Sequence, residues 1–213
     1  MLFKLPVLAL AMGTALGSPL QKRAAEVTIA NGTVIGGVKG NVEFYKGIPF
    51  AEPPVGDLRF RHPRPFNSNF GRLEATEKAA TCLQGGVTEG TSEDCLTLQV
   101  LRPVGTDASS KLPVSVFIHG GAFSGGGAED GNEMSPIVEK SVEMDAPVIM
   151  VSIQYRLGAF GFLAGKELAE DGGTNLGLRD QRLAMQWVQG KESPAEGLGK
   201  SQTPANCGLK RRE

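Results

Sequence analysis

The apolar residues of this sequence fall into segments that carry the two periods of strands and helices. Residues 112–118 and 147–153 are almost continuously apolar, as strands buried on both faces of a sheet tend to be. Residues 96–100 alternate apolar and polar positions, which predicts a strand with one buried face. Residues 176–188 repeat apolar side chains at helical spacing and predict an amphipathic helix. Buried strands that alternate with helices indicate the α/β class.

Turn and cap residues delimit the other elements. Residues 27–35 carry Asn-Gly between two β-branched segments, which predicts a β-hairpin closed by a type I′ turn. A short strand follows at 42–45, and the Pro- and Gly-rich stretch 47–65 is expected to be irregular. Residues 135–143 open with Ser-Pro, an N-cap followed by a favoured first helical residue, and predict a further helix.

One carboxylate interrupts the apolar stripe of the last helix. Asp180 lies within that stripe, and burying a carboxylate without a partner costs several kcal/mol. Arg179 and Arg182 point to the other face of the helix, so Arg156, just after the strand at 147–153, is the better candidate partner. The alternative is that Asp180 lies at the solvated margin of the stripe.

The first residues resemble a secretory signal. Residues 1–17 combine an early Lys4, an apolar stretch and small residues at the expected cleavage site. The apolar stretch is too short to span a membrane, for which ~20 residues are needed, and no later segment qualifies. An ordinary buried helix is the alternative. Residues 18–23 end in Lys-Arg and are a possible propeptide, so we expect a secreted, extracellular chain whose mature form begins at Ala24.

Composition limits the remaining choices. The 22 basic and 23 acidic residues give a net charge of −1, which offers no electrostatic case for nucleic-acid binding. Gly is frequent, at 29 of 213 residues, which suggests many tight turns and close backbone contacts. Residues 24–189 have the character of one folded domain. Residues 190–213 contain no aromatic residue and no periodicity, and are expected to form a disordered tail.

If the chain is secreted, its cysteines are expected to form disulfides. Cys82 and Cys95 enclose twelve residues, and a disulfide between them is the default expectation in an oxidising compartment. Cys207 is left over in the tail. Asn31 begins an Asn-Gly-Thr sequon and is therefore a candidate glycosylation site.

A candidate active-site loop follows the strand at 112–118. There the sequence continues as His-Gly-Gly-Ala-Phe over residues 119–123, then one serine and three glycines. Such a loop leaves backbone N–H groups unshielded, and N–H donors of this kind stabilise the oxyanion of acyl transfer by about 3 kcal/mol each. A Gly-rich turn without chemistry is the alternative. The only two histidines, His62 and His119, lack a serine in a plausible nucleophile elbow, so both are expected to be structural.

Three segments resemble other functional motifs, but each lacks a glycine that the motif requires. The segment around Ser124 has Ala122 where an elbow needs its first Gly, and the phosphate-loop-like segment ending at Ser201 has Pro194 where its first Gly belongs. The dinucleotide-type pattern that begins at Gly125 has Asp130 where its third Gly belongs. We therefore expect no cofactor and no metal.

Five segments, in order, resemble the type B carboxylesterase/lipase family, in particular its fungal secreted esterases. They are residues 45–60, 92–98, 119–123, 155–161 and 175–181.

The resemblance implies the α/β-hydrolase fold, truncated before the nucleophile elbow, and serine-dependent hydrolysis of a small-molecule ester. Residues 24–189 would be the N-terminal part of a carboxylesterase type B domain. The backbone N–H groups of Gly121 and Ala122 would be two of the three oxyanion-hole donors. The loop between the cysteines would make a poor lid, which favours an esterase for soluble esters over an interfacial lipase. Three side-chain pairs are also implied: the disulfide Cys82–Cys95 and the ion pairs Arg156–Asp180 and Arg59–Glu93.

No Gly-x-Ser-x-Gly elbow occurs in the sequence, and the family match ends near Gln189. We therefore expect a truncated product that lacks the catalytic serine, acid and histidine, and that is inactive by itself. The alternatives are a non-catalytic, cholinesterase-like binding or adhesion protein and one half of a split hydrolase. The sequence does not indicate an oligomeric state.

Overall fold

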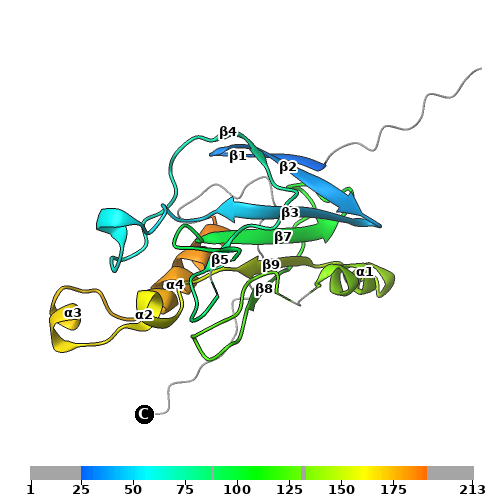
Figure 1. The fold of residues 1–213 in the computed structure, drawn as a ribbon. Helices are drawn as coiled ribbons and strands as arrows, with labels where there is room; N and C mark the ends of the chain where they lie inside the picture. Colours follow the sequence, from blue (N-terminus) through cyan, green and yellow to red (C-terminus); the bar gives the residue numbers. More distant parts are fainter. Residues whose placement is uncertain (1–24, 88, 131–132, 191–213) are drawn as a thin grey trace, which may run out of the picture.

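The computed structural model describes residues 25–87, 89–130 and 133–190. Seven strands of this part form one mixed sheet, and Figure 1 shows them stacked in order from β1 to β8. The order across the sheet is β1-β2-β3-β7-β9-β8, with β4 paired to β2. The strands are β1 (Ala25–Ile29), β2 (Gly32–Lys39), β3 (Val42–Pro49), β4 (Gly71–Glu74), β7 (Thr97–Pro103), β8 (Val114–Ile118) and β9 (Ile149–Ile153).

The strand directions change across the sheet. Neighbours from β1 to β9 are antiparallel, whereas β8 is parallel to β9 and β4 is parallel to β2. A parallel pair needs a crossover connection, and helix α1 (Ser135–Glu143) lies in the segment between β8 and β9. A separate pair, β5 (Thr81–Cys82) and β6 (Thr91–Ser92), completes the strands.

Helices cover both faces of the sheet. On one face, Val138 of α1 packs with Leu101 of β7 and Met150 of β9. On the other, Trp187 of α4 (Leu176–Val188) belongs to the main core, which also contains Val100 of β7. Consecutive strand residues point to opposite faces, so β7 is covered on both sides. The short elements are η1 (Gly56–Leu58), α2 (Gly158–Phe162) and α3 (Lys166–Glu170).

This layering corrects the expectation for β7. The alternating pattern at 96–100 predicted one buried face, but β7 is buried almost throughout, including Gln99 and Arg102. The polar side chains are tolerated because they have partners. Gln99 donates to the Ala128 carbonyl at 3.1 Å, and Arg102 donates to Glu43 at 2.7 Å.

The hairpin of β1 and β2 is confirmed, but its turn type is wrong. Ile29 pairs with Gly32, so the two-residue loop is Ala30-Asn31 rather than Asn31-Gly32. Neither loop residue has the positive φ that a type I′ turn requires. Two smaller boundaries also differ: β3 continues to Pro49, and Met134 rather than Ser135 is the N-cap of α1.

Strand β8 is less buried than its apolar sequence predicted. It lies at the end of the sheet and pairs only with β9 among the described strands, and Ile118 at its end is 39% exposed. The expectation that both of its faces are buried is therefore wrong. An apolar strand at a sheet edge is a template for association.

Several expected segments lie outside the described residues. These are the signal (1–17), the propeptide (18–23) and all of the tail after Gly190, including Cys207. Among the helices that are described, none has the length and apolar character needed to cross a bilayer.

Candidate active-site loop

The Gly-rich loop leaves the carboxyl end of β8 in an unusual backbone conformation. Three consecutive residues have positive φ: Gly121 at 111°, Ala122 at 51° and Phe123 at 63°. A Cβ added at Gly121 would lie 2.0 Å from the carbonyl oxygen of Gly125, so only glycine fits there. Positive φ is rare for non-glycine residues and tends to occur at functional sites.

This conformation exposes two backbone donors. The carbonyl of Gly121 accepts bonds from the N–H groups of Ser124 at 3.0 Å and Gly125 at 3.2 Å. The N–H groups of Gly121 and Ala122 donate to nothing within the described part of the chain, and both residues are exposed. Paired free N–H groups on a fixed backbone can bind a developing oxyanion.

Aromatic and main-chain contacts fix the start and middle of the loop. The Tyr155 hydroxyl donates to the His119 carbonyl at 2.8 Å, and the two rings stack with centroids 4.3 Å apart. Farther along, the Gly158 N–H donates to the Phe123 carbonyl at 2.7 Å, and the Phe123 ring packs against Phe162.

His119 is held by main-chain and ring contacts in this geometry. Its Nδ1 lies 2.9 Å from the Gly120 carbonyl, which can only accept, so Nδ1 carries the proton. Its Nε2 is buried without a partner, and burial lowers the pKa of His119. His62 is exposed and contacts the Gly172 carbonyl. Across residues 25–87, 89–130 and 133–190, neither histidine bonds to a serine.

A model of the Carboxylesterase family matches residues 23–191 of the chain. This chain belongs to the carboxylesterase family. It is 44% identical over 200 residues to Secreted lipase 1 of Botryotinia fuckeliana, covering 80% of this chain and 34% of that protein. It is 41% identical over 201 residues to Lipase 1 of Geotrichum candidum, covering 77% and 35% of the two chains.

Solved structures agree on the fold. The crystal structure of Aspergillus niger EstA superposes with a TM-score of 0.74 at 32% identity, covering 83% of this chain and 34% of that one. A PNB esterase gives a TM-score of 0.66 at 37% identity, covering 82% and 35%. The fold is therefore that of the α/β-hydrolases, and the chain spans about a third of the length of these relatives.

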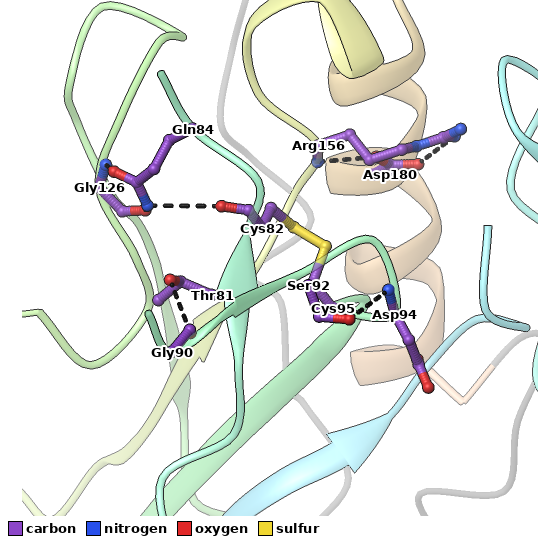
Figure 2. Close-up of a disulfide and its surroundings, with 10 residues drawn as sticks. All are labelled: Thr81, Cys82, Gln84, Gly90, Ser92, Asp94, Cys95, Gly126, Arg156 and Asp180. Carbon is purple, nitrogen blue, oxygen red and sulfur yellow. Dashed lines mark hydrogen bonds and ion pairs between the residues drawn. A yellow bond between two sulfur atoms is a disulfide. The ribbon is translucent and has the colours of Figure 1, made fainter. Parts of the chain in front are cut away.

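The carboxylesterase-family disulfide is present. Cys82 and Cys95 are bonded with their Cα atoms 5.0 Å apart, and each is 1% exposed (Figure 2). Cys82 ends β5, so the disulfide joins this small strand pair to the segment that enters β7.

Both ion pairs expected from the sequence are formed. Asp180 is fully buried and accepts three bonds from Arg156: from the backbone N–H at 3.0 Å, from Nε at 2.9 Å and from Nη2 at 2.8 Å (Figure 2). Burial raises the pKa of Asp180, and the bonds from Arg156 oppose that rise. Arg59 meets Glu93 through two bonds of 2.5 and 2.6 Å at a more exposed position.

The candidate glycosylation residue has a different task in this structure. Asn31 is 7% exposed, and its Nδ2 donates to the carbonyls of Phe66 and Ser68, each at 3.1 Å. A glycan would be attached to this same nitrogen, whose hydrogens are already in use. A glycan at Asn31 stays a prediction, and it would replace at least one of these two bonds, which explain why a buried Asn occupies the hairpin loop.

The described residues contain no group of three or more His, Cys, Asp or Glu side chains that could hold a metal ion.

The sequence did not indicate which residues hold the loop in place. Tyr155 and Gly158 lie in a segment that resembles the family, but nothing in their spacing shows that they hold the loop. Gln84, two residues after Cys82, hydrogen-bonds to the main chain of Gly126 in the loop, and no sequence pattern marks it.

Proposed function

We propose that this chain carries the oxyanion-binding part of a secreted, serine-dependent carboxylic ester hydrolase. The observation that supports this most directly is the pair of free N–H groups at Gly121 and Ala122 in a carboxylesterase-family loop. Two relatives bear the word "secreted" in their names, in agreement with the signal-like residues 1–17.

The chemistry follows from ester hydrolysis. Attack of a nucleophile on the ester carbonyl turns its oxygen into an oxyanion, which the two N–H groups would stabilise by about 3 kcal/mol each. The nucleophile, its base and the acid that orients the base are absent as a motif from these 213 residues. We infer that the 213-residue chain alone hydrolyses no ester.

The substrate we propose is a soluble, small-molecule ester. The disulfide-closed segment that ends at Cys95 is short, and the pairing of β5 with β6 and a bridge between Gln84 and Val87 close it further. Such a compact loop offers little apolar surface for a lipid interface.

The test compares the chain alone with a completed enzyme. The purified chain should release no p-nitrophenol from p-nitrophenyl butyrate above the uncatalysed rate. A chimera should be active when its first part is residues 25–190 of this chain and its remainder comes from the Botryotinia lipase. Turnover by the chain alone, or an inactive but folded chimera, would count against the proposal.

A matched pair of variants isolates the loop in that chimera. Gly121→Ala places a Cβ 2.0 Å from the Gly125 oxygen and should reduce kcat by ~10²–10³, the cost of losing one oxyanion donor. Gly120→Ala adds the same methyl group where nothing lies within 4 Å, so its loss should be far smaller. Equal losses would argue against these donors.

A further inference from the structure

The Gln84 side chain forms a two-way bond with the main chain of Gly126. The Gly126 N–H donates to Gln84 Oε1 at 3.0 Å, and Gln84 Nε2 donates to the Gly126 carbonyl at 3.2 Å. The two residues are 42 positions apart in the sequence. Figure 2 shows the Gln84 amide lying against Gly126, next to Cys82.

Gly126 is the residue at which the loop closes on itself. Its φ is +106°, and a Cβ added there would lie 2.7 Å from both the Gly120 carbonyl oxygen and His119 Nδ1. A Cβ added at Gly121 would lie even closer, 2.0 Å, to the Gly125 carbonyl oxygen. The end of the loop is therefore packed on its start, backbone against backbone, and a displacement of Gly126 must move Gly121.

Gln84 is held by a rigid platform. It follows Cys82 by two residues, and its Nε2 also lies 3.4 Å from the Cys82 carbonyl. Cys82 is fixed by the buried disulfide to Cys95 and by the pairing of β5 with β6. The amide therefore has little freedom to follow a drifting loop.

We propose that Gln84 is a positioning residue, which sets the orientation of the Gly121 and Ala122 N–H groups by holding Gly126. This inference rests on the proposed function for its catalytic consequence. The contact between Gln84 and Gly126 has a consequence of its own, which can be measured without any substrate.

The first experiment measures amide hydrogen exchange over residues 119–127 in the 213-residue chain. Gln84→Leu removes both bonds at similar size and should speed exchange of the Gly126 N–H by roughly tenfold. Gln84→Glu keeps the acceptor but, when ionised, faces the Gly126 carbonyl with a second acceptor. Protonation of that carboxyl near pH ~4.3 restores a donor, so protection should return at lower pH.

The matched control is Thr81→Val, which removes the 3.3 Å bond from Thr81 to the Gly90 carbonyl in the same disulfide-closed segment. It keeps the side-chain shape and leaves Gln84 untouched (Figure 2). Exchange in this control should stay within about twofold of wild type. If Gln84→Leu also stays within that range, Gln84 does not hold the loop and the proposal is overturned.

The second experiment places the same variants in the chimera. Gln84→Leu should lower kcat by roughly ten- to a hundredfold at unchanged KM, because misplaced donors weaken only the transition state. Faster exchange with an unchanged kcat would reduce Gln84 to a structural residue and overturn the positioning role. A wild-type chimera without activity would reject the proposed function, while the exchange result would still decide whether Gln84 fixes the loop.

Discussion

The buried pair Arg156–Asp180 offers the sharpest test of the fold. Asp180 lies on α4, and Arg156 lies just after β9, so the pair joins the last helix to the carboxyl end of the sheet. Substituting Asp180→Asn keeps the shape and removes the charge. One amide oxygen then replaces two carboxylate oxygens, and the amide nitrogen faces the Arg156 donors.

The magnitude follows from what is left behind. The Arg156 side chain is 4% exposed, and its remaining partner is the Arg61 carbonyl at 2.9 Å from Nη1. Removing one partner from a buried ion pair costs about 3–5 kcal/mol, chiefly because the other charge stays buried without compensation. A domain of ordinary stability has only about 5–15 kcal/mol in total. Asp180→Asn should therefore lose a large fraction of the free energy of unfolding.

Urea denaturation followed by tryptophan fluorescence gives this free energy, and Trp187 on the same helix reports on it directly. The double variant Arg156→Met with Asp180→Leu should be more stable than Asp180→Asn, since it removes both charges. Glu93→Gln, which breaks the more exposed pair with Arg59, is the control and should lose markedly less. A loss below about 1 kcal/mol for Asp180→Asn would refute the reasoning.

Three further outcomes are expected. Asn31→Ala removes both bonds of the Asn31 amide and should lower the free energy of unfolding in urea by about 1–3 kcal/mol. Thr33→Val destroys the sequon but spares the amide, and it should leave the electrophoretic mobility of the secreted chain unchanged. A glycan lost in Thr33→Val would contradict this. Because burial lowers the pKa of His119, the unfolded chain binds the proton more readily than the folded chain. The free energy of unfolding should therefore fall as pH drops below about 6.5, by at most ~1.4 kcal/mol per pH unit. His119→Gln should flatten that slope, with His62→Gln as the control, and an unchanged slope in His119→Gln would argue against the reasoning. Residues 24–213 should associate through the edge of β8, and Ile118→Lys should raise the monomer fraction in size-exclusion chromatography. A monodisperse wild-type monomer that melts cooperatively would contradict this.

Hydrophobic periodicity predicted the elements that bury one apolar face against the sheet. The stripe on α4 gave both the helix and the demand for a cation at Asp180, because one face of a long helix must be buried. The same reasoning failed for β7, where Gln99 looks like part of a solvated face. Gln99 and Arg102 are buried on opposite faces of the strand because each finds a partner from another element, the Ala128 carbonyl for Gln99 and Glu43 for Arg102. Such pairing leaves no trace in local spacing.

The loop shows the same limit for function. The resemblance drew attention to Gly121 and Ala122, but the pattern of residues 119–123 does not contain the contacts that shape their backbone. Helix α2, which supplies Gly158, has only five residues and no period to detect. The bond from Gln84 joins positions 42 apart through a side chain and a main chain, so only the folded geometry reveals it.

The anchors of the loop all belong to the described part of this chain. Tyr155, Gly158 and Gln84 hold its start, middle and end, and none of these contacts needs a nucleophile to be present. The donors are therefore organised by the same core that folds β8 and β9, before any acyl intermediate exists. Catalytic donors act most strongly when they need no rearrangement as charge develops. If the proposed function holds, a serine next to this loop would meet donors that are already in place, which is why the chimera tests the proposal more directly than any assay of the chain alone.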